Sequence, residues 1–203
     1  MPLFIRMTYL ISLLSLFSPV YAGTSSIDEK YLSILGFKLE ETHLSTIQEK
    51  LGQAPIHRQG TGANAVPRIC YYDETNKATI YFESSPMGGQ KLRLMSFTIL
   101  ATNEQHDFCG ILRLTETSLR VGELALGGEI NTVTKLLPQP IEYIKGYGYL
   151  HKHFSTTPFS AADIKRLNVS NLRTAFWSVS IYIEVFESHN IVDGFKVSKL
   201  TSW

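Results

Sequence analysis

Two histidines, His151 and His153, have the spacing closest to a metal-binding or catalytic pattern in this chain. Side chains alternate along a β-strand, so residues two apart project from the same face and could share a metal ion. Structural zinc sites take four protein ligands and catalytic zinc sites at least three, so the pair alone is incomplete. We therefore expect two histidines on a solvated sheet face. A small hydrolase or metal-dependent enzyme that uses them is the alternative.

Other catalytic patterns in the sequence lack the context that they need. Residues 60–65 read G-T-G-A-N-A, which has the form of a dinucleotide-binding loop. Such a loop must open a helix whose N-terminus holds the pyrophosphate, whereas Pro67 and a strand-like segment follow here. The sequence contains neither a G-x-S-x-G nor an H-E-x-x-H motif. We therefore predict a protein that is not an enzyme and that has no cofactor and no metal.

The composition is that of an ordinary globular protein. Of 203 residues, 44% are hydrophobic and 18% are charged, which argues against a disordered chain and a multispan membrane protein. The 19 Lys and Arg residues balance 18 Asp and Glu residues, and no basic block marks a phosphate-binding face. We therefore expect no nucleic-acid partner.

The first 22 residues have the pattern of a secretory signal peptide. Arg6 precedes the apolar stretch 10–20, which is shorter than the roughly 20 residues that a membrane-spanning helix needs. The small residue Ala22 then offers a cleavage site. We predict cleavage before Gly23, and hence a periplasmic or secreted protein whose mature chain has no stable membrane anchor.

The two cysteines, Cys70 and Cys109, would then reside in an oxidising compartment. A pair in such a compartment is more often bonded than free, so we expect a disulfide between them. Two buried free thiols are the alternative.

The exported part of the chain contains an internal similarity. Residues 46–56 read TIQEKLGQAPI and residues 132–141 read TVTKLLPQPI, while residues 79–83 (TIYFE) match residues 180–184 (SIYIE) in the same order. A duplication explains both matches, with chance similarity as the alternative. We accordingly divide the chain into a signal peptide (1–22), a first module (23–115) and a second module (116–203).

Each module has the same predicted elements. A helix over residues 43–51 is expected to be capped by Thr42 and ended by Gly52, and a similar apolar stripe begins at Ile130. Alternating strand-like runs follow each helix, at 68–72, 78–83, 92–100, 141–145, 147–154, 175–186 and 195–200. The predicted fold class is α+β, with two tandem modules, each a short helical layer packed on an antiparallel β-sheet. An insertion near 155–173 has a short helix that Ser160 could cap.

Several short motifs resemble a known family. They are Leu51–Pro55, Cys70–Tyr72 and Ile80–Phe82 in the first module, and Leu137–Pro140 and Ile181–Ile183 in the second. The chain resembles tandem SmpA/OmlA-type modules of the β-lactamase inhibitory protein-like superfamily. It lacks the lipid-accepting cysteine of the lipoproteins, and its second module has no cysteine. The resemblance implies protein binding through a concave sheet, but not β-lactamase as the target.

Strand alternation predicts the binding face. Trp177, Ile181 and Ile183 share one face of their strand, which we expect to pack under the helices. The opposite face should be rich in side chains that combine apolar area with a polar group, which suit protein recognition. The candidate protein-binding residues are Tyr81, Tyr147, Tyr149, His151, His153, Phe176, Tyr182 and Glu184.

The expected function is therefore non-enzymatic binding of another envelope or extracellular protein, as an inhibitor or an assembly factor. If the insertion or the neighbouring module covers the aromatic side chains, they are core instead. A carrier of a hydrophobic ligand between the modules is a further alternative.

Overall fold

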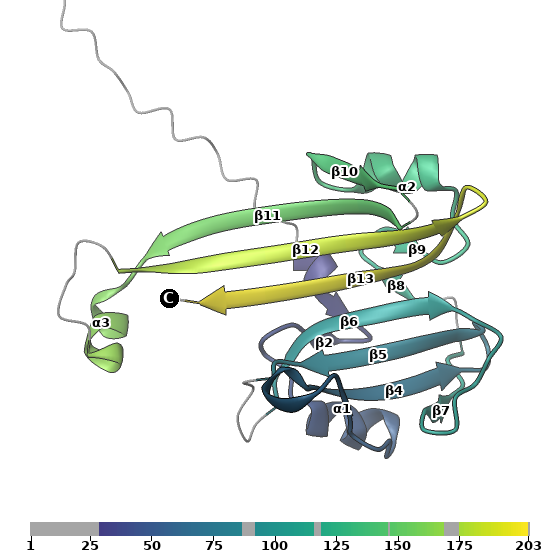
Figure 1. Ribbon diagram of the computed structural model, residues 1–203, viewed down its shortest axis with the longest axis horizontal. Coiled ribbons are helices and arrows are strands. Elements are labelled where there is room, and N and C mark those ends of the chain that lie inside the picture. The colour runs from purple at the N-terminus through teal and green to yellow at the C-terminus, as the bar shows by residue number, and fades with distance from the viewer. Residues whose placement is uncertain (1–28, 87–91, 116–118, 146, 169–174, 203) are drawn as a thin grey trace, which may run out of the picture.

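A single β-sheet of nine strands dominates the structure (Figure 1). The computed structural model describes residues 29–86, 92–115, 119–145, 147–168 and 175–202. The strands of this sheet are β3 (His57–Gln59), β4 (Val66–Asp73), β5 (Ala78–Ser84), β6 (Leu94–Ala101), β7 (Gly110–Leu112), β10 (Ile141–Ile144), β11 (Gly148–Pro158), β12 (Phe176–Ser188) and β13 (Ile191–Ser202). Their order is β10-β11-β12-β13-β6-β5-β4-β3, with neighbours antiparallel, and β7 pairs with β4 in parallel.

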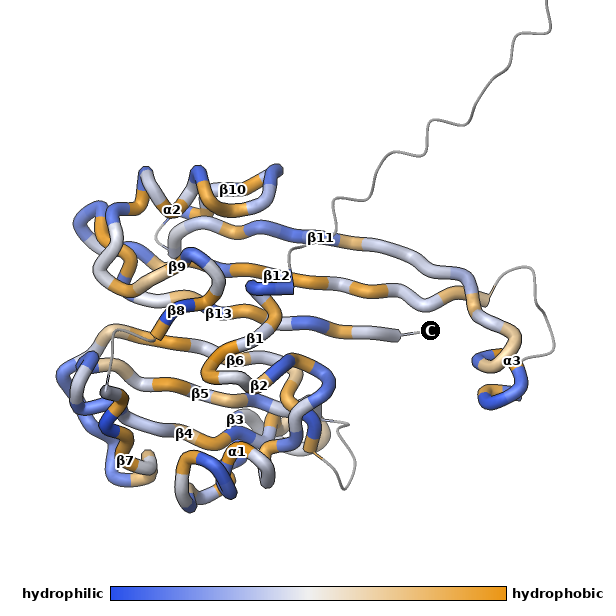
Figure 2. Tube along the Cα trace, turned by 180° about the vertical axis from the view of Figure 1, so that it is seen from behind, coloured by the Kyte–Doolittle hydropathy of each residue, from blue (hydrophilic) through white to orange (hydrophobic). Residues whose placement is uncertain are grey.

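Short elements cover one face of the sheet, as the view from behind shows (Figure 2), and leave most of the other face open (Figure 1). They are η1 (Glu29–Leu32), β1 (Ser33–Ile34), β2 (Phe37–Lys38), α1 (Leu44–Leu51), β8 (Arg120–Val121), β9 (Leu124–Ala125) and α2 (Ile130–Leu136). Ile47 of α1 and Val133 of α2 belong to the same buried cluster as Phe97 and Ile183 of the sheet. We call this side the covered face and the other side the open face.

The helix α1 forms as its sequence pattern indicates. Leu44 and Ile47 are buried on one side of it, and Gly52 ends it with a positive φ of 98°. Thr42 is not the cap that the sequence predicts, because the N-cap position is His43 and makes no side-chain hydrogen bond there. The Thr42 hydroxyl instead accepts a hydrogen bond from the backbone N–H of Lys38 at 2.9 Å, which ties the helix to β2.

The prediction of two helix-on-sheet modules is wrong. Lys196 of β13 lies opposite Thr98 of β6, within a five-residue antiparallel pairing that joins the strands of both predicted modules into one sheet. Two separate sheets would leave these edges unpaired, and pairing them satisfies their backbone hydrogen-bonding groups. The helices are short, and a single buried cluster draws on both parts of the chain. The molecule is therefore one sheet-dominated body.

The order of elements is nonetheless similar in the two halves. A two-stranded hairpin, a short helix, one short strand and three longer antiparallel strands follow one another from β1 to β6. The same succession runs from β8 to β13, apart from the 3-10 helix η2 (Gly62–Asn64) between β3 and β4 and the helix α3 (Ala161–Leu167) between β11 and β12. The two sets meet through their last strands, so the sheet order of one half is the reverse of the other.

The second set of strands is longer and extends past the first. Beyond Ser198, β13 has no pairing with β6, and β11 and β12 continue alongside it (Figure 1). We call residues 152–158, 176–182 and 199–202 the arm. The helix α3 (Ala161–Leu167) lies between β11 and β12 at the end of the arm. Its N-cap is Ser160, as the sequence predicts, and Ser160 forms a capping box with Asp163. Residues 169–174 of the predicted insertion lie outside the described residues.

The predicted signal peptide, residues 1–22, and its cleavage site before Gly23 also lie outside the described residues. Within the described part of the chain, none of the helices has the length and apolar character to cross a membrane.

Candidate functional site

Strand register divides the candidate residues between the two faces. His151 lies opposite Ile183 and Tyr149 lies opposite Val185, so these two candidates share the covered face with core residues. His153, opposite Ile181, faces the same way. Tyr81, Phe176, Tyr182 and Glu184 lie on the open face. The structure therefore does not bring all eight candidates together.

Tyr147 joins the open-face residues although Tyr149 does not. Tyr147 belongs to the turn before β11, so strict alternation does not apply to it. Its hydroxyl donates a hydrogen bond to Glu184 Oε2 at 3.0 Å, and its ring packs edge-on against Phe186. Burial, with a smaller contribution from this hydrogen bond, raises the pKa of Tyr147 above its usual value of 10.0.

His151 is buried, at 2% exposure, and it lies among residues of the core. Its Nδ1 lies 2.9 Å from the carbonyl oxygen of Pro140, an acceptor, so Nδ1 carries the proton in this contact. Its Nε2 has no hydrogen-bond partner among the described residues. Nowhere in the described ranges do three His, Cys, Asp or Glu residues gather in a way that could hold a metal ion. The geometry gives the histidine pair no third ligand there.

The arm carries an apolar group on the open face, which we call the arm patch: Phe154, Phe176, Tyr182 and Leu200. Phe154 is 62% exposed, Leu200 52% and Phe176 49%, while Tyr182 is half-buried. Phe154 and Leu200 flank Ser180 in one row across the three strands, and the rings of Phe154 and Tyr182 meet edge-on at 5.8 Å. Large apolar side chains with this exposure on one surface are typical of interaction sites.

A row of alternating charges lies beside the arm patch. Lys196 is opposite Glu184 in the register, and its Nζ lies 3.6 Å from Glu83 Oε2. Ser96 donates a hydrogen bond to the same Glu83 oxygen at 2.8 Å. The row therefore combines ionic and hydrogen-bonding groups from both halves of the chain on the open face.

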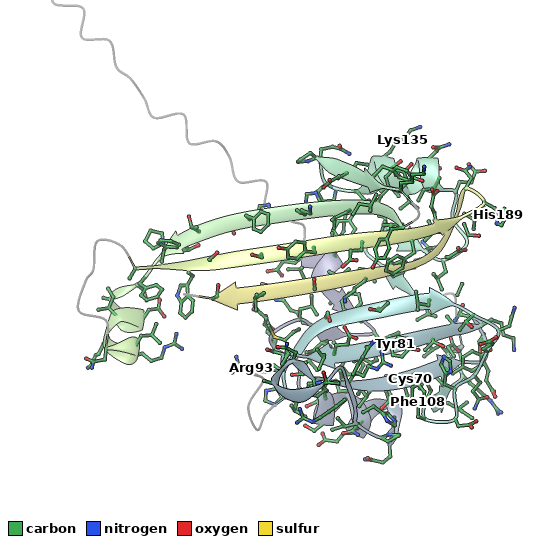
Figure 3. The ribbon with its side chains drawn as sticks, in the orientation of Figure 1. Cys70, Tyr81, Arg93, Phe108, Lys135 and His189 are labelled. Atoms are coloured by element: carbon green, nitrogen blue, oxygen red, sulfur yellow. A yellow bond between two sulfur atoms is a disulfide. The ribbon has the colours of Figure 1, made fainter. Side chains whose placement is uncertain are left out.

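The disulfide occupies the far corner of the open face. Cys70 on β4 is bonded to Cys109, and both are buried with Tyr72, as the sequence predicts for the pairing. Phe108 and Tyr81 pack around them, and Figure 3 shows Cys70, Tyr81 and Phe108 close together beside β4 and β5. The bond holds the segment before β7 across this corner of the sheet.

The charged side chain of Arg68 borders this corner. The guanidinium of Arg68 lies over the ring of Tyr81, 4.7 Å from its centre. In a cation–π contact of this kind the positive charge is attracted to the face of the ring. Tyr81 therefore belongs to the corner that the disulfide closes, while the rest of the open face lies toward the arm.

No protein-family model, no curated protein and no solved structure matches this chain. The site must therefore be interpreted from its own geometry.

Sequence reasoning missed Phe154 and Leu200, the two most exposed members of the arm patch. It assigned the binding face of β11 to the tyrosine and histidine positions, and Phe154 alternates with those. The signal that identifies the correct face is the pairing of β11 with β12, where Phe154 lies opposite Ser180 rather than opposite a core residue. That pairing depends on a connection of 17 residues between the strands, 159–175, and alternation within either strand does not determine it.

Two cavities of about 350 Å³ lie away from the arm patch. One is lined by Glu40, Arg93 and Trp177, among others, on the covered side of the arm. The other lies between Asn76, Ala101 and the β8–β9 hairpin. Both are near the lower end of the volumes that ligand sites have.

Proposed function

We propose that the protein binds another envelope or extracellular protein through the open face of its sheet, with the arm patch as the centre of contact. The observation that carries this proposal is the exposure of Phe154, Phe176 and Leu200 on one uncovered surface. Aromatic side chains in such positions often supply most of the binding energy of an interface. The charge row beside the patch would orient the partner.

The proposed location of the partner is supported by the disulfide. Cys70 and Cys109 are bonded, and bonds of this kind persist in oxidising compartments such as the periplasm and the extracellular space. The predicted signal peptide at residues 1–22 agrees with export. A partner in the envelope or outside the cell would share that compartment.

The experiment that tests this proposal compares matched surface variants as baits in envelope extract. Phe176→Ala and Leu200→Ala remove members of the arm patch. Tyr143→Ala and Ile56→Ala are their controls, because these side chains are similarly exposed, at 55% and 44%, but do not belong to the patch. Captured proteins are identified by mass spectrometry. The protein that the control variants retain is purified, and its binding to each variant is measured by calorimetry.

We expect the two patch variants to weaken binding of the purified partner by about 30-fold or more, which corresponds to roughly 2 kcal/mol at an interface hot spot. The two control variants should bind as the wild-type protein does. Equal binding by patch and control variants would show that the arm patch is not the contact surface.

A further inference from the structure

The outer edge of β11 is partly unpaired. β10 pairs with β11 only from Gly148 to His151. Ile141, the first residue of β10, lies opposite His151. From Lys152 to Pro158, β12 pairs with one side of β11, and among the described ranges no strand pairs with the other side. In Figure 1 this edge is the upper border of the arm, and α3 lies below the arm strands, away from it. In the part of the chain that the structure describes, seven residues therefore present an open β-edge.

Such an edge needs a partner of a particular chemistry. Alternate residues of an edge strand direct their backbone N–H and C=O groups away from the sheet, and only another extended backbone satisfies them in series. Natural edges are often protected by lysine or proline. Here those two residue types stand at the ends of the open edge, as Lys152 and Pro158, and residues 153–157 between them contain neither.

We propose that two copies of this protein pair through this edge, β11 against β11, in antiparallel register centred on Ser155. The register follows from length. With Ser155 opposite its own copy, Lys152 lies opposite Pro158 of the second copy, so each strand fills the open edge and ends where the other copy's β10 begins. A shift of the register in one direction would leave residues of the open edge unpaired. A shift in the other direction would make the end of one strand overlap β10 of the other copy.

The side chains agree with this register. Phe154 would lie opposite Thr156 of the second copy on the open face, and His153 opposite Thr157 on the covered face. The only formal charge in the segment, Lys152, meets a proline and is remote from the Lys152 of the other copy. Its Nζ is already paired with Glu142 Oε2 at 3.0 Å. No like charges oppose each other.

The pairing would also cover exposed apolar area. Phe154, the most exposed side chain of the arm patch, stands next to the edge, and the added strand would pack beside its ring. About six backbone hydrogen bonds would form between the copies in either hydrogen-bonding phase, because Pro158 has no N–H to give. The two sheets would become one continuous sheet with both open faces on the same side.

A cysteine pair tests the register. In the Ser155→Cys variant the two introduced thiols would face each other across the two-fold axis, within the roughly 5 Å that separates opposed Cβ atoms. In the Thr157→Cys variant, on the same face, they would be offset by four residues, roughly 13 Å along the strands. The native cysteines are bonded to each other and do not interfere. Mild oxidation should link the first variant into a dimer and leave the second variant unlinked.

Sedimentation of the purified protein across the micromolar range tests the association itself, and needs no partner protein. We expect a concentration-dependent dimer. The N–H groups of Ser155 and Thr156 point to opposite sides of the strand, so one of Ser155→Pro and Thr156→Pro removes an outward N–H and keeps the pairing with β12. That variant is recognised by its unchanged melting temperature, and should weaken the dimer at least about tenfold.

The Ser155→Ala and Thr156→Ala variants keep both N–H groups and should dimerise like the wild-type protein. A monomer at every concentration overturns the proposal. So does a dimer that is unaffected in the folded proline variant, or that links equally well through position 157. None of these outcomes bears on whether the arm patch binds another protein.

Discussion

His151 on β11 and Ile183 on β12 lie directly opposite each other, and both side chains are buried on the covered face of the sheet. This relationship fixes the direction of the other side chains along β11, and along β12 as far as the register shift after Phe186, since neighbours alternate. It makes His151 part of the packing under the sheet. It also assigns Phe154 and Tyr182 to the open face.

We expect His151→Ala to destabilise the fold. The change removes the contact with the Pro140 carbonyl and leaves a cavity beside Ile183, at a cost of about 2–4 kcal/mol in the free energy of unfolding. Lys152→Ala, one residue along and exposed, is the control and should change stability by less than about 1 kcal/mol. Urea unfolding measures both. Equal stability of the two variants would contradict the register.

The neighbouring pair on β12 gives a second test of the faces. Ile183→Ala should lower stability by about 2–5 kcal/mol, because the side chain is fully buried. Tyr182→Ala should cost less, about 1 kcal/mol, and should weaken capture of a partner. Thermal unfolding of the two variants measures the difference. If Tyr182→Ala is the more damaging change, the open face is misassigned.

Loss of the disulfide should destabilise the protein without unfolding it at room temperature. The bond closes a loop between residues 39 apart in sequence, and its removal typically costs about 2–4 kcal/mol. The double variant Cys70→Ala/Cys109→Ala is compared with the wild-type protein in urea. Peptide mapping under non-reducing conditions should first find Cys70 linked to Cys109 in exported material, and two free thiols there would argue against an oxidised native state.

The α3 cap should respond to pH. Hydrogen bonds from the Ser160 hydroxyl and backbone, with a smaller effect of the Arg166 charge, lower the pKa of Asp163 below 3.8. A carboxyl whose pKa is lower in the folded state stabilises that state above the unfolded value, and this stabilisation is lost as pH falls through the folded value. The NMR signals of α3 should therefore keep their native positions at pH 3.8 and change only at lower pH. Asp163→Asn should remove that transition.

The start of the exported chain is a prediction from sequence alone. N-terminal sequencing of protein recovered after export should begin at Gly23, since the small residue Ala22 precedes the expected cleavage site. A membrane-bound form that retains residues 1–22 would contradict it.

The local elements of the fold could be predicted, and their assembly could not. Leu44 and Ile47 form an apolar stripe and Gly52 ends the helix, so α1 can be identified from the sequence. Both signals depend only on residues that are close together in the chain. The pairing of Val197 with Phe97 joins residues a hundred positions apart. Nothing in either strand specifies that partner, so two sheets were a consistent but incorrect interpretation.

The candidate site was predictable for β12 and not for β11. In β12 the alternate positions Ile181, Ile183 and Val185 are all apolar, which identifies the buried face and so places Tyr182 correctly. In β11 the alternating positions hold Tyr149 and His151 on one side and Leu150 and Phe154 on the other, so neither side is clearly apolar. Only the pairing with β12 decides between them.

The position of β13 in the sheet has a consequence for how the protein forms. Of the strands described in this sheet, β13 comes last in sequence, yet it lies inside the sheet between β12 and β6, so β6 has no neighbour on that side until residues 194–198 are available. From the synthesis of β6 until that of β13, an emerging chain would therefore hold an exposed β-edge, a state prone to aggregation. Chaperoning before completion, and slow folding dominated by distant contacts, are the expected costs of this topology.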